Sequence, residues 1–167
     1  MDDDFNCRRI LCNSLIQPYL DYCSSSWYSS LTKELRNRLD VIQRRMVRFV
    51  YSWDRMSHVG LGDLGRLSWL SIPDRVKFFK LTMLFKTRIG TAPGYLSSNL
   101  VPLTASHGHN TRRSPFNYLV SKEMANSLKS FTFTAVSHWN ELPNSLQGLP
   151  SLATFKSRLK RHLFSSY

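Results

Sequence analysis

The clearest pattern of apolar and polar positions in the chain lies between residues 32 and 53. Apolar side chains recur there at steps of four, three, four, three and four residues, at Leu35, Leu39, Ile42, Met46, Phe49 and Trp53. This spacing places them on one stripe of a single α-helix. Thr32 is suited to cap the helix, and Glu34 lies in the first turn, where the helix dipole favours an acid. The pattern therefore predicts a helix that packs through this stripe.

The arginines of this helix fall largely off the stripe and allow two interpretations. In the first, the helix belongs to the core and Arg36, Arg44, Arg45 and Arg48 form a solvated basic face. In the second, the helix packs through one face and lays the basic face near a polyanion. The pattern leaves both open.

A second helical pattern covers residues 6–28, where Pro18 should kink or divide the helix. Only residues 29–31 separate it from the next helix, so we expect an antiparallel helical hairpin. Further on, Ser71 and Asp74 have the spacing of a capping box, ahead of a helix whose wide apolar surface should be buried on more than one side. Gly90 is suited to end that helix.

The C-terminal third predicts short helices near residues 95–100 and 132–141, and a clearer helix after Ser151. The stripe of this last helix is Leu152, Phe155, Leu159 and Leu163, and its polar side is Lys156, Arg158, Lys160 and Arg161. Turn-forming residues dominate residues 103–117, which we expect to form a loop or linker.

The elements together predict a mainly α fold: a helical hairpin, a further helix pair and a small C-terminal helical segment, with at most a short β-hairpin. The expected division is 1–57 for the hairpin, 58–102 for a glycine-rich connection and long helix, 103–117 for the loop or linker, and 118–167 for a basic helical segment.

Charge is distributed unevenly along the chain. The 167 residues hold 23 basic and 11 acidic side chains, a net charge of +12. Residues 1–74 hold ten basic and nine acidic residues, whereas residues 75–167 hold thirteen basic and two acidic ones. Such an excess favours a polyanionic partner, although a merely basic globular protein is the alternative.

Compartment and membrane signals are few. The three cysteines, Cys7, Cys12 and Cys23, make no disulfide framework and no CxxC pair, so we expect reduced thiols in an intracellular protein of the nucleus or cytoplasm. Without an apolar run of 18 residues or a signal peptide, we expect no membrane partner.

Patterns typical of catalysis or metal binding are weak. The acids Asp2, Asp3 and Asp4 form the chain's clearest carboxylate cluster, at a terminus prone to fraying. The GLGDLG segment at residues 60–65 follows no strand, so we interpret it as turns rather than a dinucleotide loop. His107 and His109 lack a third ligand nearby. We therefore expect no enzymatic activity, no metal and no cofactor.

Basic residues interleaved with aromatic ones make the pattern that points to function. Groups of this kind neutralise phosphates without reading bases. The aromatic residues around them, such as Phe116 and Tyr118, either stack on unpaired bases or belong to the core, and we favour the core. The candidate nucleic-acid-binding residues are Arg44, Arg45, Arg48, Arg112, Arg113, Lys156, Arg158, Lys160 and Arg161.

Two segments carry a resemblance to a known family. The first combines Pro18, Leu20 and Tyr22 with Trp27 and then with Leu39, Gln43, Arg44 and Arg45 in a Leu-x-x-x-Gln-Arg-Arg helix. The second combines Phe131 and Phe133, Trp139-Asn140-x-Leu142-Pro143, Ser151-Leu152, Phe155-Lys156, Leu159-Lys160 and Leu163-Phe164. In this order they resemble the region after the polymerase core of non-LTR (LINE-type, jockey-like) retrotransposon reverse transcriptases.

The resemblance implies that the hairpin corresponds to the thumb, a helical subdomain that grips the template–primer duplex. The family's catalytic signature, an aromatic-Ala-Asp-Asp turn on a palm sheet, is absent, and Asp2, Asp3 and Asp4 do not replace it. We therefore expect a non-catalytic remnant that binds the backbone of RNA or of an RNA–DNA duplex without sequence preference. The alternatives are an interaction domain that packs on the missing polymerase core, through apolar surface such as that of residues 78–85, or a fragment without its own function.

Overall fold

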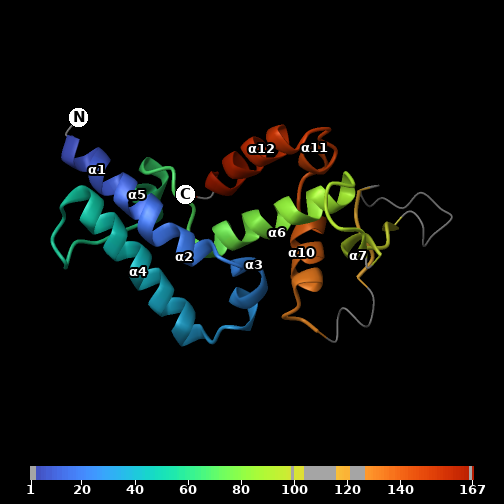
Figure 1. Cartoon of the computed structure of the whole chain (residues 1–167), viewed down its shortest axis with the longest axis horizontal. Helices are drawn as coiled ribbons and strands as arrows, with labels where there is room; N and C mark the ends of the chain where they lie inside the picture. The colour runs from blue at the N-terminus through green and yellow to red at the C-terminus, as the bar shows by residue number, and fades with distance from the viewer. Residues whose placement is uncertain (1–2, 99, 104–115, 121–126, 166) are drawn as a thin grey trace. The chain divides into compact units, whose positions relative to one another are not determined.

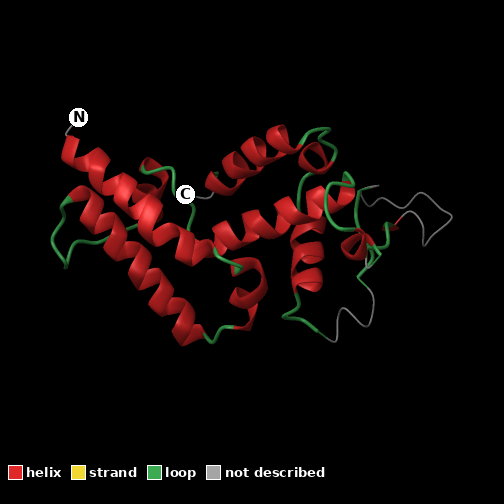
Figure 2. Ribbon diagram, in the orientation of Figure 1, coloured by secondary structure: helices red, strands yellow, loops and turns green. Residues whose placement is uncertain are grey.

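The computed structural model describes residues 3–98, 100–103, 116–120, 127–165 and 167. Over these ranges the chain is mainly α-helical, as predicted (Figures 1 and 2). The β structure of the same ranges is an isolated antiparallel bridge between Pro102 and Tyr118.

The helical elements of the described ranges follow one another along the chain. Their bounds are α1 (Asp3–Leu11), a π-helical turn (Cys12–Ile16), α2 (Gln17–Asp21), α3 (Ser24–Trp27), a 3-10 turn (Tyr28–Ser30), α4 (Lys33–Tyr51), α5 (Leu61–Arg66), α6 (Ile72–Arg88), α7 (Gly94–Ser97), α10 (Phe131–Asn140), α11 (Asn144–Gln147) and α12 (Leu152–Phe164).

The chain divides into two compact units. Unit 1 contains Met1–Val76 and Leu163–Tyr167, and unit 2 contains Lys77–His162, so the boundary between them falls inside α6. The four-segment division expected from the sequence stays a prediction. Most of its loop segment, residues 104–115, lies outside the described residues.

The predicted hairpin is the main feature of unit 1. The segment from α1 to α2 runs alongside α4 in the opposite direction (Figure 1). Pro18 does divide the first helix: a π-helical turn ends at Ile16, and α2 begins with Pro18 in its first turn, where the missing N–H costs nothing. A further break occurs at Cys23, whose φ of 49° lies in the left-handed region.

The predicted start of α4 is confirmed, but its predicted buried stripe is only partly right. The Thr32 hydroxyl accepts a hydrogen bond from the Leu35 amide at 3.3 Å. Of the six stripe residues Met46 is buried, whereas Leu35, Ile42 and Phe49 keep 40%, 38% and 48% of their surface exposed. The buried face of α4 is rotated away from the stripe and consists of Gln43, Met46, Val47 and Val50.

Gln43 explains the rotation. Its carboxamide donates a hydrogen bond to the Leu70 carbonyl at 2.8 Å and accepts one from the Ile72 amide at 3.2 Å. These backbone groups lie where the chain leads into α6, and leaving them unpaired in the interior would cost about 1–3 kcal/mol each. A polar residue therefore occupies the centre of the buried face.

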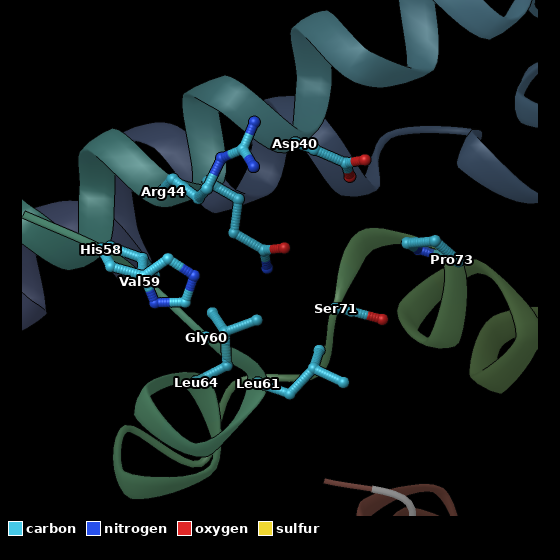
Figure 3. Close-up of a pocket in the computed structure, with 10 residues that line it drawn as sticks. Asp40, Arg44, His58, Val59, Gly60, Leu61, Leu64, Ser71 and Pro73 are labelled. Carbon is cyan, nitrogen blue, oxygen red and sulfur yellow. The ribbon is translucent and has the colours of Figure 1, made fainter.

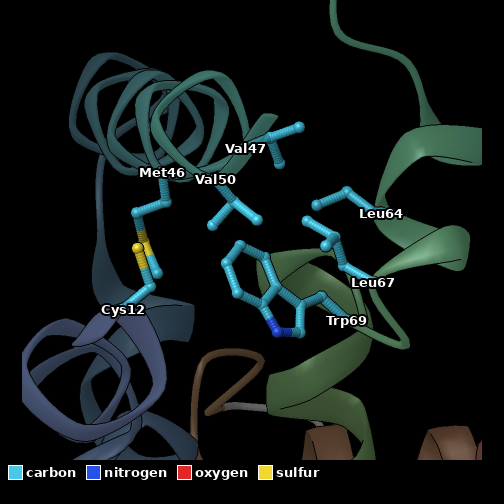
Figure 4. Packing of buried hydrophobic residues seen from close by; sticks show 7 residues of the cluster. All are labelled: Cys12, Met46, Val47, Val50, Leu64, Leu67 and Trp69. Carbon is cyan, nitrogen blue, oxygen red and sulfur yellow. The ribbon is translucent and has the colours of Figure 1, made fainter. Parts of the chain in front are cut away.

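The core of unit 1 forms between the hairpin and the segment around α5. It contains Cys12, Met46, Val47, Val50, Leu64, Leu67 and Trp69. Figure 4 shows the sulfur atoms of Cys12 and Met46 pointing toward one another between the helices. Burial raises the pKa of the Cys12 thiol, which keeps it protonated and inert as a small apolar residue.

The predicted start and end of α6 are confirmed. The Ser71 hydroxyl donates to the Asp74 carboxylate at 2.6 Å and accepts from the Asp74 amide at 3.3 Å. Gly90, with a φ of 73°, follows the helix in the left-handed conformation that favours glycine. Leu81, Leu84 and Phe85 are buried, so most of the apolar surface that we considered as an interface is used inside the chain.

Unit 2 is built around an aromatic cluster. The rings of Phe85 and Phe155 stack with centroids 4.2 Å apart, and Trp139 lies 5.8 Å from Phe155. Of the predicted α12 stripe, Phe155, Leu159 and Leu163 are buried and Leu152 is half-buried. The predicted cap of α12 is confirmed, because the Ser151 hydroxyl accepts from the Thr154 amide at 3.2 Å.

Candidate nucleic-acid interface

The side of α12 opposite its buried stripe is basic. Lys156, Arg158 and Arg161 are exposed on it, whereas Lys160 is half-buried and makes other interactions. Because Phe155 and Leu159 are fully buried on the other side, the backbone that carries these cations is anchored. Three of the four cations predicted on this helix are therefore accessible, spread around the part of α12 that its buried stripe leaves free.

The two units differ sharply in charge. Unit 2 holds twelve basic and two acidic residues, a net charge of +10, and unit 1 holds eleven basic and nine acidic residues, a net charge of +2. Some cations of unit 2 are internal: Lys80 is buried and donates to the Thr134 hydroxyl at 2.7 Å, and the Arg88 guanidinium lies 4.8 Å from the Phe116 ring centroid. The cations of α12 remain accessible.

The three arginines predicted on α4 have different surroundings. Arg48 donates from Nε to the Ser57 carbonyl at 2.8 Å and so holds the segment that follows α4. Arg44 lies at the wall of a pocket, and Arg45 is exposed without an ion pair among the described residues. Arg112 and Arg113, like His107 and His109, lie outside the described residues.

The pocket beside Arg44 has a volume of about 380 Å³. Asp40 and Arg44 line it from α4, and Figure 3 shows His58, Val59 and Gly60 on the segment that faces this helix. Burial raises the pKa of the Asp40 carboxyl, and the nearby Arg44 guanidinium opposes that rise. Asp40 and His58 are not among the site residues predicted from the sequence, because only packing brings these distant residues together.

The Trp139-Asn140 pair of the second resemblance segment has a structural role. The Trp139 indole donates to the Phe116 carbonyl at 2.8 Å. The Asn140 side chain accepts from the Tyr118 amide at 3.0 Å and donates to the Tyr118 carbonyl at 2.9 Å. These bonds attach residues 116–118 to α10, so the side chains of Phe116 and Tyr118 are used in packing, as favoured from the sequence.

The hairpin also exposes apolar residues, among them part of the α4 stripe that was predicted to pack. Besides Leu35, Ile42 and Phe49 of α4, the preceding helices expose Ile10, Leu11, Leu15, Ile16, Tyr19 and Tyr22. Large exposed apolar patches mark interaction sites more often than they mark neutral surface. The exposure of the residues in the preceding helices was not visible in the sequence, because Pro18 and the π-helical turn change the helical phase there.

Searches of family models, curated proteins and solved structures find no match to this chain. Within the described ranges, no three metal-ligating side chains gather into one group. Nor does any helix in those ranges combine the length and apolar character needed to cross a membrane.

Proposed function

We propose that this chain is a non-catalytic protein that binds the sugar–phosphate backbone of RNA or of an RNA–DNA duplex without sequence preference. The observation that carries the proposal is the group of exposed cations Lys156, Arg158 and Arg161 on an anchored helix, in a unit with a net charge of +10. Cations in such an arrangement neutralise phosphates and release counterions. Contacts of this kind to phosphates carry no sequence information directly.

The same proposal relates the chain to the region after the polymerase core of non-LTR reverse transcriptases. Two of its motif residues have structural roles in this chain: Gln43 pairs the backbone ahead of α6, and Asn140 pairs the backbone of Tyr118. The catalytic aspartate signature is absent from the sequence. The chain would act inside the cell, in the nucleus or cytoplasm, as a binding remnant of an RNA-directed DNA polymerase.

Salt dependence tests the nucleic-acid proposal. Fluorescence anisotropy with a labelled RNA–DNA duplex of mixed sequence should show affinity that falls steeply as salt rises. The triple variant Lys156→Ala/Arg158→Ala/Arg161→Ala should lower the slope of log K against log salt by about 2–3, or roughly 0.9 for each lost phosphate contact. A salt-independent affinity would contradict the proposal.

A charge-matched control separates a binding face from a general loss of charge. Arg9→Ala/Lys33→Ala/Arg38→Ala removes three exposed cations from unit 1 and should change the slope much less. Arg45→Ala tests α4 by itself, because Arg45 makes no ion pair within the described residues. Arg48 is unsuitable for this purpose, since its bond to Ser57 makes it structural.

A second candidate function, a protein-interaction domain, is favoured by the exposed apolar side of the hairpin. In this proposal the partner is the polymerase core that the chain lacks, or another protein. Ile42→Glu should lower the fluorescence of an apolar dye bound to the native chain, whereas Lys156→Glu should not. Equal dye binding by both variants would show that the hairpin is not an apolar binding surface.

A further inference from the structure

We propose that the exposed side of the hairpin binds an amphipathic, acidic helix of a partner protein, an inference that rests on the second function proposed above. This surface, the hairpin face, consists of Leu11, Leu15 and Tyr19 from the first helices and Leu35, Ile42 and Phe49 from α4.

The contact between Arg8 and Phe49 aligns the two rows of the hairpin face. The Arg8 guanidinium lies 5.7 Å from the Phe49 ring centroid and donates to the Phe49 carbonyl at 3.5 Å. Leu11 and Leu15 follow Arg8 at steps of three and four, while Ile42 and Leu35 precede Phe49 at steps of seven. Phe49, Ile42 and Leu35 therefore share one side of α4, and the contact of Arg8 with Phe49 places α1 beside it.

The exposure of the hairpin face is too large to be incidental. Leu15 and Tyr19 keep 61% and 82% of their surface exposed, and the three α4 residues keep between 38% and 48%. Leucine, isoleucine and aromatic residues exposed along a helix form the kind of surface on which a second amphipathic helix packs. Burying such a row supplies about 25 cal/mol for each Å² of apolar surface.

Charge identifies the kind of helix that fits. Arg38 and Arg45 lie one helical step from Ile42, beside the apolar row, and both are exposed without an ion pair among the described residues. Arg8 already pairs with Asp4 at 2.5 Å, so it adds little net charge. Glu34 is an acid in the first turn of α4, at the far end of the row from Phe49. The middle of the face is therefore flanked by unpaired positive charge, which favours acidic flanks on the partner.

The same charges disfavour other occupants. A second copy of the chain would bring Arg38 and Arg45 against like charges or leave them unpaired at the interface. A nucleic-acid duplex would pair the arginines but would leave the leucine and isoleucine side chains exposed to water. An acidic amphipathic helix would cover the leucine and isoleucine side chains with its apolar residues and would pair Arg38 and Arg45 with its acids.

Two synthetic helical peptides serve as probes for the full chain. Both have leucines at positions i, i+3, i+4 and i+7; one has glutamates beside them and the other has lysines. Binding is measured by fluorescence anisotropy. We expect the chain to bind the glutamate peptide at least about tenfold more tightly than the lysine peptide.

Charge-swap and apolar variants locate the binding. Arg38→Glu/Arg45→Glu should reverse the preference between the peptides, and Ile42→Glu should weaken both by about tenfold or more. Lys156→Glu/Arg158→Glu changes charge equally on α12 and should leave the preference unchanged. Cooperative thermal unfolding at an unchanged temperature would confirm that each variant is folded.

The possible outcomes separate this inference from the function on which it rests. Equal binding of both peptides, lost in Ile42→Glu, would overturn the acidic partner but leave the interaction surface intact. Binding of neither peptide would overturn both. Two further results would overturn the acidic helix as occupant. One is a dimer of the chain that Ile42→Glu converts to a monomer. The other is binding of anionic lipid vesicles or of a duplex, in place of the glutamate peptide, through the same residues.

Discussion

The helices α4 and α12 have similar amphipathic patterns but use them differently. On α12 the apolar residues expected in the interior, Phe155 and Leu159, are fully buried, and its cations face solvent. On α4 the buried face includes Gln43, while Ile42 and Phe49 of the expected stripe are exposed. The pattern of apolar and polar residues in a helix therefore predicts which side chains are buried only where the helix has one apolar face, as α12 does and α4 does not.

The sequences of the two helices explain the difference. α12 has one apolar stripe, and the residues between its members are polar or small. α4 also has Val47 and Val50, so a second apolar face lies beside the first. The two backbone bonds of Gln43 then favour burial of that second face. As a result, the outer surface of α12 is basic, whereas that of α4 combines arginines with apolar side chains.

The largest expected difference between the two helices concerns their phenylalanines. Phe155→Ala should lower the free energy of unfolding by about 3–5 kcal/mol, because it leaves a cavity in the aromatic cluster of unit 2. Phe49→Ala should cost about 1 kcal/mol or less, since Phe49 is half exposed. Urea denaturation measures both. Equal losses would mean that the predicted stripe of α4 is buried in solution.

Gln43 provides the next test, with Arg45 as the control on the same helix. Gln43→Ala should lower the free energy of unfolding by about 2 kcal/mol, because it leaves the buried Leu70 carbonyl and Ile72 amide without partners. Arg45→Ala, at an exposed position, should change it by no more than about 0.5 kcal/mol. If Gln43→Ala were as mild as Arg45→Ala, the rotation of α4 would need another cause.

A smaller effect is expected from His138 in unit 2. Burial, and to a lesser extent the nearby Lys77 and Lys80, lower the pKa of His138 below its ordinary value of 6.5, although Glu141 opposes this. The unfolded chain then binds a proton more readily than the folded one, so stability falls as the pH drops below about 6.5. His138→Gln should remove this part of the acid sensitivity in thermal unfolding curves at several pH values. An unchanged pH profile would contradict the prediction.

The smallest effect, of opposite sign, is expected from Asp40 in unit 1. Its pKa is raised by burial, so the folded state disfavours the carboxylate and loses stability as the pH rises above the ordinary value of 3.8. Asp40→Asn should therefore slightly raise Tm at pH 7, and the gain should vanish at a pH below 3.8. A lower Tm at pH 7 would show that attraction between Asp40 and Arg44 outweighs the burial cost.

Local chemistry made the helix ends predictable. Thr32, Ser71 and Ser151 cap the helices that they were expected to cap, since a cap depends on residues three positions apart. Gly90 ends α6 for an equally local reason. The candidate cations of α12 were predictable in the same way, because one clear stripe determines the opposite face.

The amino-acid sequence by itself determined the mainly α fold, the helical hairpin, the helix caps and the basic side of α12, because each depends on neighbouring residues and helical periodicity. Only the tertiary structure decided which face of α4 is buried. It also decided that Arg48 supports a neighbouring segment, that Asn140 pairs the backbone of Tyr118, and that Asp40 and His58 share a pocket. These features depend on backbone groups and side chains that are distant in the sequence, whose need for partners arises only when the helices pack.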